Sequence, residues 1–250
     1  ALMNNWIIPN WPAPHNVKSL FTTRTGGFST GNNAIYASLN LGAHVNDNWV
    51  DVERNRTLLR RYLPNDPKWL KQVHGTVPIC IENTVALTPE GDAVFSRQRE
   101  AVCAIMVADC LPIFLCDKTG TTVGIVHAGW RGLSAGIIEQ TLAAMQVDPS
   151  QVMAWLGPAI GPAHFEVGVG VYEAFVNDDE QAKLAFSPSS TQPEEKWLAD
   201  IFLLARQRLS KIGVTEISGG GICTFSDPVR FYSYRRDGET GRMAALIWLE

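Results

Sequence analysis

The sequence predicts one α/β (α+β) domain over residues 1–250, and three observations carry this prediction. Short apolar segments of strand length alternate with segments of helical period along the whole chain. No internal repeat, low-complexity tract or long linker divides the chain. Several strand-like segments are apolar on both faces, which is typical of a sheet that is covered on both sides.

The predicted strands are short segments rich in aliphatic and β-branched residues. Val102–Val107 is apolar at every position and is expected to be fully buried. The order of the strands in the sheet does not follow from these patterns. The predicted strands lie at residues 19–23, 77–81, 102–107, 113–116, 122–127, 152–156 and 244–249.

Amphipathic segments between the strands predict helices. Leu133–Met145 and Trp197–Leu209 carry apolar residues with a period near 3.6, which places them on one helical face. Asp51–Tyr62 is a more polar helix, with Asp51 as its predicted N-cap. Phe186–Glu195 is polar and punctuated by proline, so we expect it to be a mobile loop.

Composition and charge exclude several classes of protein. Of the residues, 46% are hydrophobic and 18% are charged, so the chain is not a disordered protein, a coiled coil or a collagen. A net charge of −4 argues against a nucleic-acid partner, because binding to phosphate backbones needs a basic excess. The longest apolar runs, such as Ala101–Ala108, are too short to cross a membrane, which takes about 20 residues.

The N-terminal residues lack the pattern of a signal peptide, so we expect a cytoplasmic protein without a membrane partner. Ala1 and Leu2, ahead of Met3, are expected to be left over from cloning. The five cysteines are odd in number and form no CxxC pair, so no disulfide framework is expected. We expect most of them to be buried thiols, and one of them to serve another purpose.

Three motifs interrupt the regular pattern with chemically active residues. They are Lys71–Gly75, Ala108–Pro112 and His127–Gly132. Each places a histidine or a cysteine at the end of a predicted strand, beside glycine or proline. In α/β proteins, catalytic groups are commonly found at strand ends.

Together, His74, Cys110 and His127 predict a metal site with two imidazoles and one thiolate. Three protein ligands and one open position are typical of catalytic zinc, which lowers the pKa of its bound water toward neutrality. Two alternatives remain. Cys110 could be a nucleophile with His127 or His74 as its base and Asp109 as the residue that orients the base. The same residues could also form a buried thiol with two hydrogen-bonded histidines.

A glycine-rich turn that opens a helix suggests a site for an anion. In His127–Gly132 the glycines permit close approach of the backbone, and Arg131 could bind a phosphate. The alternative is a simple strand-to-helix turn that Trp130 packs. Arg24, Asn40 and Arg235 also lie in predicted turns.

Seven motifs in the same order point to a known family. Together they resemble the YfiH family, which is also called the multicopper polyphenol oxidase or laccase-domain family, from about residue 7 to the last strand. Many members of that family have Cys-Tyr-Glu-Val-Gly where this chain has His164–Gly168. The motifs are Phe21–Gly27, Ser38–His44, Gln72–Gly75, Ala108–Pro112, His127–Gly132, Gly157–Gly161 and Ser233–Gly238.

The resemblance implies a single-domain layered sandwich of mixed β-sheet and helices with one zinc ion. His74, Cys110 and His127 match the family's metal ligands, and Cu²⁺ is a possible occupant of the same site. Family members are described as purine nucleoside enzymes. They phosphorolyse adenosine, guanosine, inosine and methylthioadenosine, and they deaminate adenosine. The chain has too few candidate ligands for a multicopper cluster.

Each activity asks something different of the pocket. Deamination would use a zinc-bound hydroxide and a general acid. Asp109 is a catalytic candidate, although in an extended segment its side chain would point away from that of Cys110. Phosphorolysis needs a site for phosphate, and our candidates for phosphate or ribose contacts are Arg24, Asn40, Arg131 and Arg235.

The expected partners are therefore purine nucleosides and phosphate. The first alternative is a peptidoglycan-editing amidase, which removes L-serine from UDP-MurNAc-L-Ser and would use the same metal on a carbonyl. A laccase-like polyphenol oxidase and a metal-binding module without an activity of its own are further alternatives. The sequence gives no oligomeric state.

Overall fold

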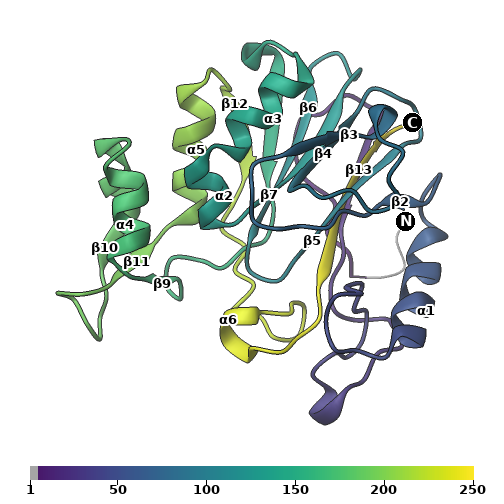
Figure 1. Cartoon of the computed structure of the whole chain (residues 1–250), viewed down its shortest axis with the longest axis horizontal. Helices are drawn as coiled ribbons and strands as arrows, with labels where there is room; N and C mark the ends of the chain where they lie inside the picture. The colour runs from purple at the N-terminus through teal and green to yellow at the C-terminus, as the bar shows by residue number, and fades with distance from the viewer. Residues whose placement is uncertain (1–4) are drawn as a thin grey trace.

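Two β-sheets pack face to face at the centre of the computed structural model, which describes residues 5–250 (Figure 1). Ala1 and Leu2 lie outside the described residues. The first sheet has six strands, and its order from edge to edge is β12 (Glu216–Gly219), β8 (Val152–Leu156), β6 (Leu111–Asp117), β7 (Val123–Ala128), β4 (Ala93–Ser96) and β3 (Pro78–Cys80). The second has four strands, in the order β1 (Val17–Phe21), β13 (Met243–Leu249), β5 (Val102–Val107) and β2 (Pro67–Lys68).

Helices cover the outer faces of both sheets. On the six-stranded sheet lie α2 (Trp130–Ala135), α3 (Ile137–Met145) and α5 (Ile201–Lys211). Helix α1 (Trp49–Arg60) lies against the four-stranded sheet. The result is a four-layer sandwich of helices, sheet, sheet and helix, which confirms the predicted fold class.

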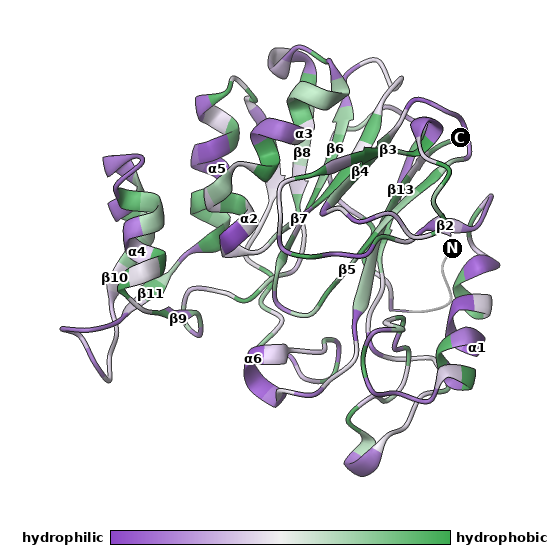
Figure 2. Cartoon of the chain, viewed as in Figure 1, coloured by the Kyte–Doolittle hydropathy of each residue, from purple (hydrophilic) through white to green (hydrophobic). Residues whose placement is uncertain are grey.

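The alternation of side chains along β5 explains why a strand in this sandwich is apolar throughout. Cys103, Ile105 and Val107 face the core between the two sheets. Val102 and Ala104 point the other way, into the core beneath α1. Because successive residues of a strand point to opposite faces, a strand between two apolar layers has no polar side (Figure 2).

A smaller unit projects from one end of the sandwich (Figure 1). It consists of α4 (Val169–Val176) and a three-stranded sheet in the order β10 (Phe186–Pro188), β11 (Trp197–Ala199), β9 (Glu166–Val167). Short 3-10 helices at Asn32–Ala34, Ile81–Asn83, Pro149–Gln151 and Glu180–Ala185, and the one-turn helix α6 (Tyr234–Asp237), complete the described elements.

The predicted strands all occur, but the helix boundaries need correction. Asn48 rather than Asp51 caps α1, and its side chain accepts a hydrogen bond from the amide of Val50. Gly136, with a φ of 108°, divides the predicted helix Leu133–Met145 into α2 and α3. Trp197–Ala199 forms β11, so the helix predicted from Trp197 begins only at Ile201.

Two further predictions also change. Phe186–Pro188 pairs with β11, so the predicted loop Phe186–Glu195 begins with a strand. All five cysteines are free, as expected, but only Cys103 and Cys116 are buried, and the other three are partly exposed. None of the described helices is long and apolar enough to span a membrane.

Candidate metal centre

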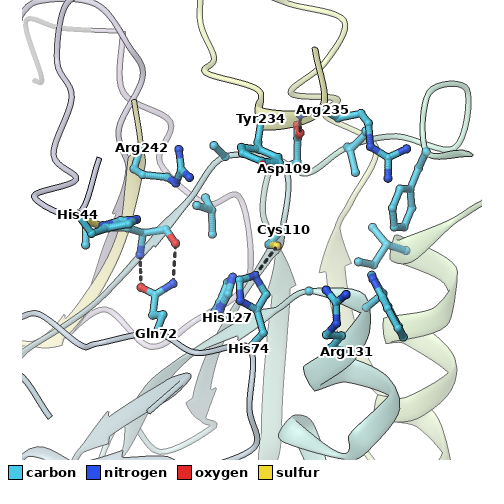
Figure 3. A pocket seen from close by; sticks show the side chains of 18 residues that line it. His44, Gln72, His74, Asp109, Cys110, His127, Arg131, Tyr234, Arg235 and Arg242 are labelled. Atoms are coloured by element: carbon cyan, nitrogen blue, oxygen red, sulfur yellow. Dashed lines mark hydrogen bonds between the residues drawn. The ribbon is translucent and has the colours of Figure 1, made fainter. Parts of the chain in front are cut away.

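His74, Cys110 and His127 come together in the structure. One potential ligand atom from each lies within 4.8 Å of those of the other two, and this is the one such cluster found among residues 5–250. The sulfur of Cys110 is 3.9 Å from Nε2 of His74 (Figure 3). The centroids of the two imidazole rings are 4.9 Å apart.

The two central sheets bring these side chains to one place. Cys110 lies where the chain crosses from β5 of the four-stranded sheet to β6 of the six-stranded sheet. His127 is in β7 and pairs with Pro112 of β6, two residues beyond Cys110. His74 lies in the loop before β3, with a φ of 60°. Each ligand is therefore at a strand end or in a loop beside one.

A buried aspartate, Asp92, holds the two histidines in place. Its carboxylate is 2.7 Å from Nδ1 of His127, and it accepts hydrogen bonds from the amides of Val73, His74 and Gly75 at 2.9 to 3.1 Å. Because Nδ1 of His127 is occupied in this way, Nε2 is left for a metal. One carboxylate thus fixes both the ring of His127 and the backbone that carries His74.

Two neighbours complete this support. The side-chain amide of Gln72 both donates to and accepts from the backbone of Met106 at 2.8 Å, which ties the loop of His74 to β5. Gly129 lies beside the ligands, and a Cβ atom there would be 3.0 Å from the sulfur of Cys110 and 3.2 Å from Cδ2 of His74. A side chain at this position would therefore crowd Cys110 and His74.

The electrostatics of the cluster favour a thiolate beside an imidazolium. Burial acts to raise the pKa of Cys110, but the charge and hydrogen bonds of His127 and His74 outweigh it and lower this pKa. Burial likewise acts to lower the pKa of His127, but Cys110 and Asp92 outweigh it and raise this pKa. The cysteine is thus prepared to act as an anionic ligand.

The donor set fits a tetrahedral metal with one open position. Zinc–sulfur and zinc–nitrogen bonds of ordinary length place a sulfur and a nitrogen ligand about 3.6 Å apart. The observed 3.9 Å between Cys110 and His74 is close to this value. Two imidazoles and a thiolate suit zinc, and they also suit copper.

The three side chains form the floor of a cavity of about 490 Å³. To one side lie His44, Gln72 and Arg242, and to the other lies Arg131 (Figure 3). The lining also includes a group of apolar residues. The apolar group comprises Trp130, Ile160, Phe165 and Ile201. The volume is typical of a site for a small molecule.

A comparison with known proteins identifies the family. The family model described as "Multi-copper polyphenol oxidoreductase laccase" matches residues 18–250. The chain belongs to this family. The resemblance to YfiH proteins is confirmed as well, because curated relatives carry that name.

Relatives in this laccase family are similar over nearly their whole length. "Purine nucleoside phosphorylase PA4543" of Pseudomonas aeruginosa is 49% identical, over 99% of this chain and 100% of its own. "Purine nucleoside phosphorylase YfiH" of Escherichia coli is 47% identical over the same shares of the two chains.

Solved structures of similar proteins share the fold. The crystal structure of Neisseria meningitidis NMB0706 has a TM-score of 0.93 and 46% sequence identity, over 99% of this chain and 100% of that one. YlmD of Geobacillus stearothermophilus has a TM-score of 0.86 and 28% identity, over 100% and 98%. The sandwich is thus a fold that this chain shares with both solved structures.

The structure divides the predicted substrate residues of this laccase-family chain into two groups. Arg131 and Arg235 line the cavity. Arg24 and Asn40 are not among its lining residues. Arg24 donates to the carbonyls of Ala37 and Pro228, so its guanidinium connects loops.

Asp109 contributes to the cavity in a different way from Cys110. Its carboxylate accepts hydrogen bonds from the hydroxyls of Thr224 and Ser233 and from the amide of Arg235, at 2.6 to 3.0 Å. With a φ of 106°, its backbone turns sharply before Cys110. The side chain therefore connects the cavity wall to α6, and its predicted catalytic role stays a prediction.

Sequence patterns missed several residues of the site. Tyr234 and Arg242 line the cavity, and Asp92 lies behind it. Asp92 follows a glycine and precedes the apolar run of β4, and an acid in that position is a signal that could have been noticed. His164 stacks on Phe225 with ring centroids 4.2 Å apart, and it does not line the cavity.

Proposed function

We propose that this chain is a purine nucleoside phosphorylase, which transfers the ribosyl group of a purine nucleoside to inorganic phosphate. The observation that carries the proposal is the cavity itself, where a triad of potential metal ligands lies between cationic and aromatic side chains. Arginines recognise phosphate, and aromatic side chains and guanidinium groups stack on flat bases. The names of the similar relatives support the same function.

The metal that we propose for the site is zinc, bound by His74, Cys110 and His127. When bound, zinc would supply a Lewis acid that polarises a substrate oxygen or a water molecule. Residues of the protein orient the ligands and balance the charge. Asp92 holds His127 in one tautomer and orientation, and the Cys110 thiolate balances the charge of the metal.

The rim of the cavity orients the substrate. Arg131 and Arg235 are exposed side chains that stack on Trp130 and Phe165, with their guanidinium carbons 4.7 and 5.5 Å from the ring centroids. We propose that they contact the nucleoside. Asp109 holds the amide of Arg235 and so fixes this part of the rim.

The same cavity would accept inosine, guanosine and methylthioadenosine, because all of them share the purine and the ribose. Deamination of adenosine is a second reaction that the proposed metal would support. Peptidoglycan editing is the alternative. Phenol oxidation by several coppers has little support, since the described part of the chain gathers one cluster of three potential ligands.

A product assay on adenosine tests the proposal. The purified protein is incubated with adenosine, with and without phosphate, before and after chelation and zinc repletion, and the products are separated by chromatography. We expect adenine that depends on phosphate, is lost on chelation and returns with zinc. Inosine formed without phosphate would report deamination.

Two cysteine variants complete the assay. Cys110→Ala should lose metal and activity, while Cys80→Ala should keep both, because Cys80 is also partly exposed but lies in β3, outside the cavity. If wild type yields no more adenine than Cys110→Ala, the phosphorylase proposal fails, and UDP-MurNAc-L-Ser is the next substrate to test. Activity that survives chelation but not iodoacetamide would favour the cysteine nucleophile instead.

A further inference from the structure

Arg242 differs from the other arginines of the cavity. It is half-buried, whereas Arg131 and Arg235 are exposed. Its Nη1 donates to the carbonyls of Thr240 and Gly241. Among residues 5–250 it forms no ion pair, and its Nε and Nη2 have no hydrogen-bond partner. A half-buried guanidinium with free donors, directed into a cavity, is a strong site for an anion.

The structure holds Arg242 rigidly in this position. The side-chain oxygen of Asn40 accepts hydrogen bonds from the amides of Gly42 and Arg242 at 3.0 and 2.9 Å. A Cβ at Gly42 would be 2.9 Å from Cγ of Arg242, so the stem of the arginine packs on the glycine backbone. Asn40 is fully buried, and its amide nitrogen donates to Asp47. Asn40 is therefore a positioning residue for Arg242.

The surroundings of Arg242 are also suited to an anion. His44 and Gln72 are its neighbours on this side of the triad (Figure 3). The one carboxylate in the cavity lining is that of Asp109, and the hydroxyls of Thr224 and Ser233 and the amide of Arg235 already donate hydrogen bonds to it. No free carboxylate of the described lining would repel a phosphate there.

The opposite side of the triad has the character of a base-binding site. Ile160, Phe165 and Ile201 are buried and apolar, and Trp130 lies beside them. Arg131 and Arg235 lie over the rings of Trp130 and Phe165, 4.7 and 5.5 Å from the ring centroids, whereas Arg242 is 5.9 Å from the ring centroid of Tyr234. A flat purine base binds such a surface more favourably than phosphate does, because phosphate is a strongly hydrated dianion.

The chemistry of phosphorolysis requires two separate subsites. A phosphate oxygen forms a bond to C1′ while the bond from C1′ to N9 breaks, and the electron pair leaves with the purine, which takes up the proton of the phosphate. In a direct displacement, phosphate and base lie on opposite sides of C1′. We infer that inorganic phosphate binds at Arg242 beside His44, and that the purine binds across the triad against Trp130 and Phe165. This inference rests on the proposed function.

A phosphate titration that needs no turnover tests the assignment. Inorganic phosphate is titrated by calorimetry into zinc-replete wild type, Arg242→Gln and Arg242→Lys. We expect Arg242→Gln to weaken phosphate binding by about 10- to 100-fold, and Arg242→Lys to retain part of it. Arg206→Gln is the matched control, because Arg206 is also half-buried, donates to two carbonyls and lies outside the cavity lining.

Steady-state kinetics then separate the two subsites. Arg242→Gln should raise KM for phosphate about tenfold or more and change KM for adenosine by less than about threefold. The double variant of Arg131→Gln with Arg235→Gln should show the reverse. Asn40→Ala should resemble a weaker form of Arg242→Gln. Melting curves of all variants identify any loss of folding.

The outcomes distinguish this assignment from the proposed function. Phosphate binding that is equal in wild type and Arg242→Gln, or absent from both, overturns the assignment, even if wild type phosphorolyses adenosine. Phosphate binding that is lost with Arg131 and Arg235 instead overturns it too. A wild type that binds phosphate through Arg242 but forms no adenine refutes the phosphorylase and leaves the phosphate site standing.

Discussion

Two buried aspartates lie near the candidate metal centre, and they hold different segments of the chain in place. Asp92 contacts one imidazole and three backbone amides, all in the segments that carry the ligands. Asp109 contacts two hydroxyls and one amide, all in segments that form the cavity wall. The two carboxylates are almost equally buried, with exposed fractions of 0% and 8%.

The difference in their partners gives the two carboxylates opposite pKa shifts. Burial raises the pKa of Asp92, but the bond and charge of His127 and the backbone amides outweigh it, so that the pKa is lowered. Burial also raises the pKa of Asp109, and there the hydroxyls of Thr224 and Ser233 and the amide of Arg235 do not outweigh it. A buried carboxylate remains a good anion where a potential cation faces it.

The largest effect is expected from Asp92→Asn. The amide keeps the shape of the carboxylate, but it removes the charge that holds His127 and one acceptor for the amides of the loop. We expect zinc affinity to fall by about 10- to 100-fold, as is usual for a residue that orients a metal ligand. Competition with a chelating dye measures this loss.

Asp117→Asn is the matched control for that experiment. Asp117 is also buried and accepts hydrogen bonds from the amides of Thr121 and Thr122, but it lies in β6 away from the cavity lining. The Asp117→Asn variant should bind zinc with the same affinity as wild type. Equal losses of affinity in the two variants would show that Asp92 has no special role at the metal.

A smaller effect is expected from Asp109→Asn. The change should lower the free energy of unfolding by about 1–2 kcal/mol, because a hydroxyl or amide donor loses its acceptor. Zinc affinity should change by less than about threefold. The carboxylate of Asp109 forms its hydrogen bonds with Thr224, Ser233 and Arg235, and none of these is a candidate metal ligand. Urea denaturation and the dye assay measure the two quantities. A loss of zinc as large as that of Asp92→Asn would remove the distinction between the two aspartates.

The smallest expected effect is a pH dependence of the free energy of unfolding that comes from Asp117. Although burial acts to raise its pKa, hydrogen bonds from Thr119, Thr121 and Thr122 outweigh it and lower the pKa. The ionised group therefore stabilises the fold above its unfolded pKa of about 3.9, and this contribution is lost as the pH falls through the folded pKa.

Asp117→Asn is neutral at every pH and should lower the free energy of unfolding by about 1 kcal/mol at pH 7. The difference from wild type should shrink as the pH falls below 4, which denaturation at several pH values can follow. A difference that stays constant down to pH 2 would contradict this explanation.

The grouping of His74, Cys110 and His127 could be predicted from the sequence because each lies at the end of an apolar strand or in a loop beside one. The residues that hold these three side chains in place could not be predicted in the same way. Asp92 acts through the amides of Val73, His74 and Gly75, which are about twenty positions away in the chain, and a contact of that kind leaves no periodic signal. Asn40 was predicted to contact substrate, but its side-chain oxygen accepts hydrogen bonds from the amides of Gly42 and Arg242, and its side-chain nitrogen donates to Asp47.

Helix boundaries were missed for a local reason. The helical period continues across Gly136, but the left-handed backbone there ends α2 and begins α3. Trp197 fits the apolar face of a helix equally well, but its backbone pairs with Val167 of β9. Periodicity alone cannot distinguish these cases, because tertiary contacts decide them.

The short crossing between β5 and β6 has an evolutionary consequence. Ala108, Asp109 and Cys110 are all that connect the two sheets at this point, so we expect one inserted residue to displace Cys110 from the two histidines. Insertions and deletions among relatives should therefore be absent between Val107 and Leu111. They should gather instead in the turn between Pro188 and Trp197, at the edge of the molecule, where a change of length moves no ligand.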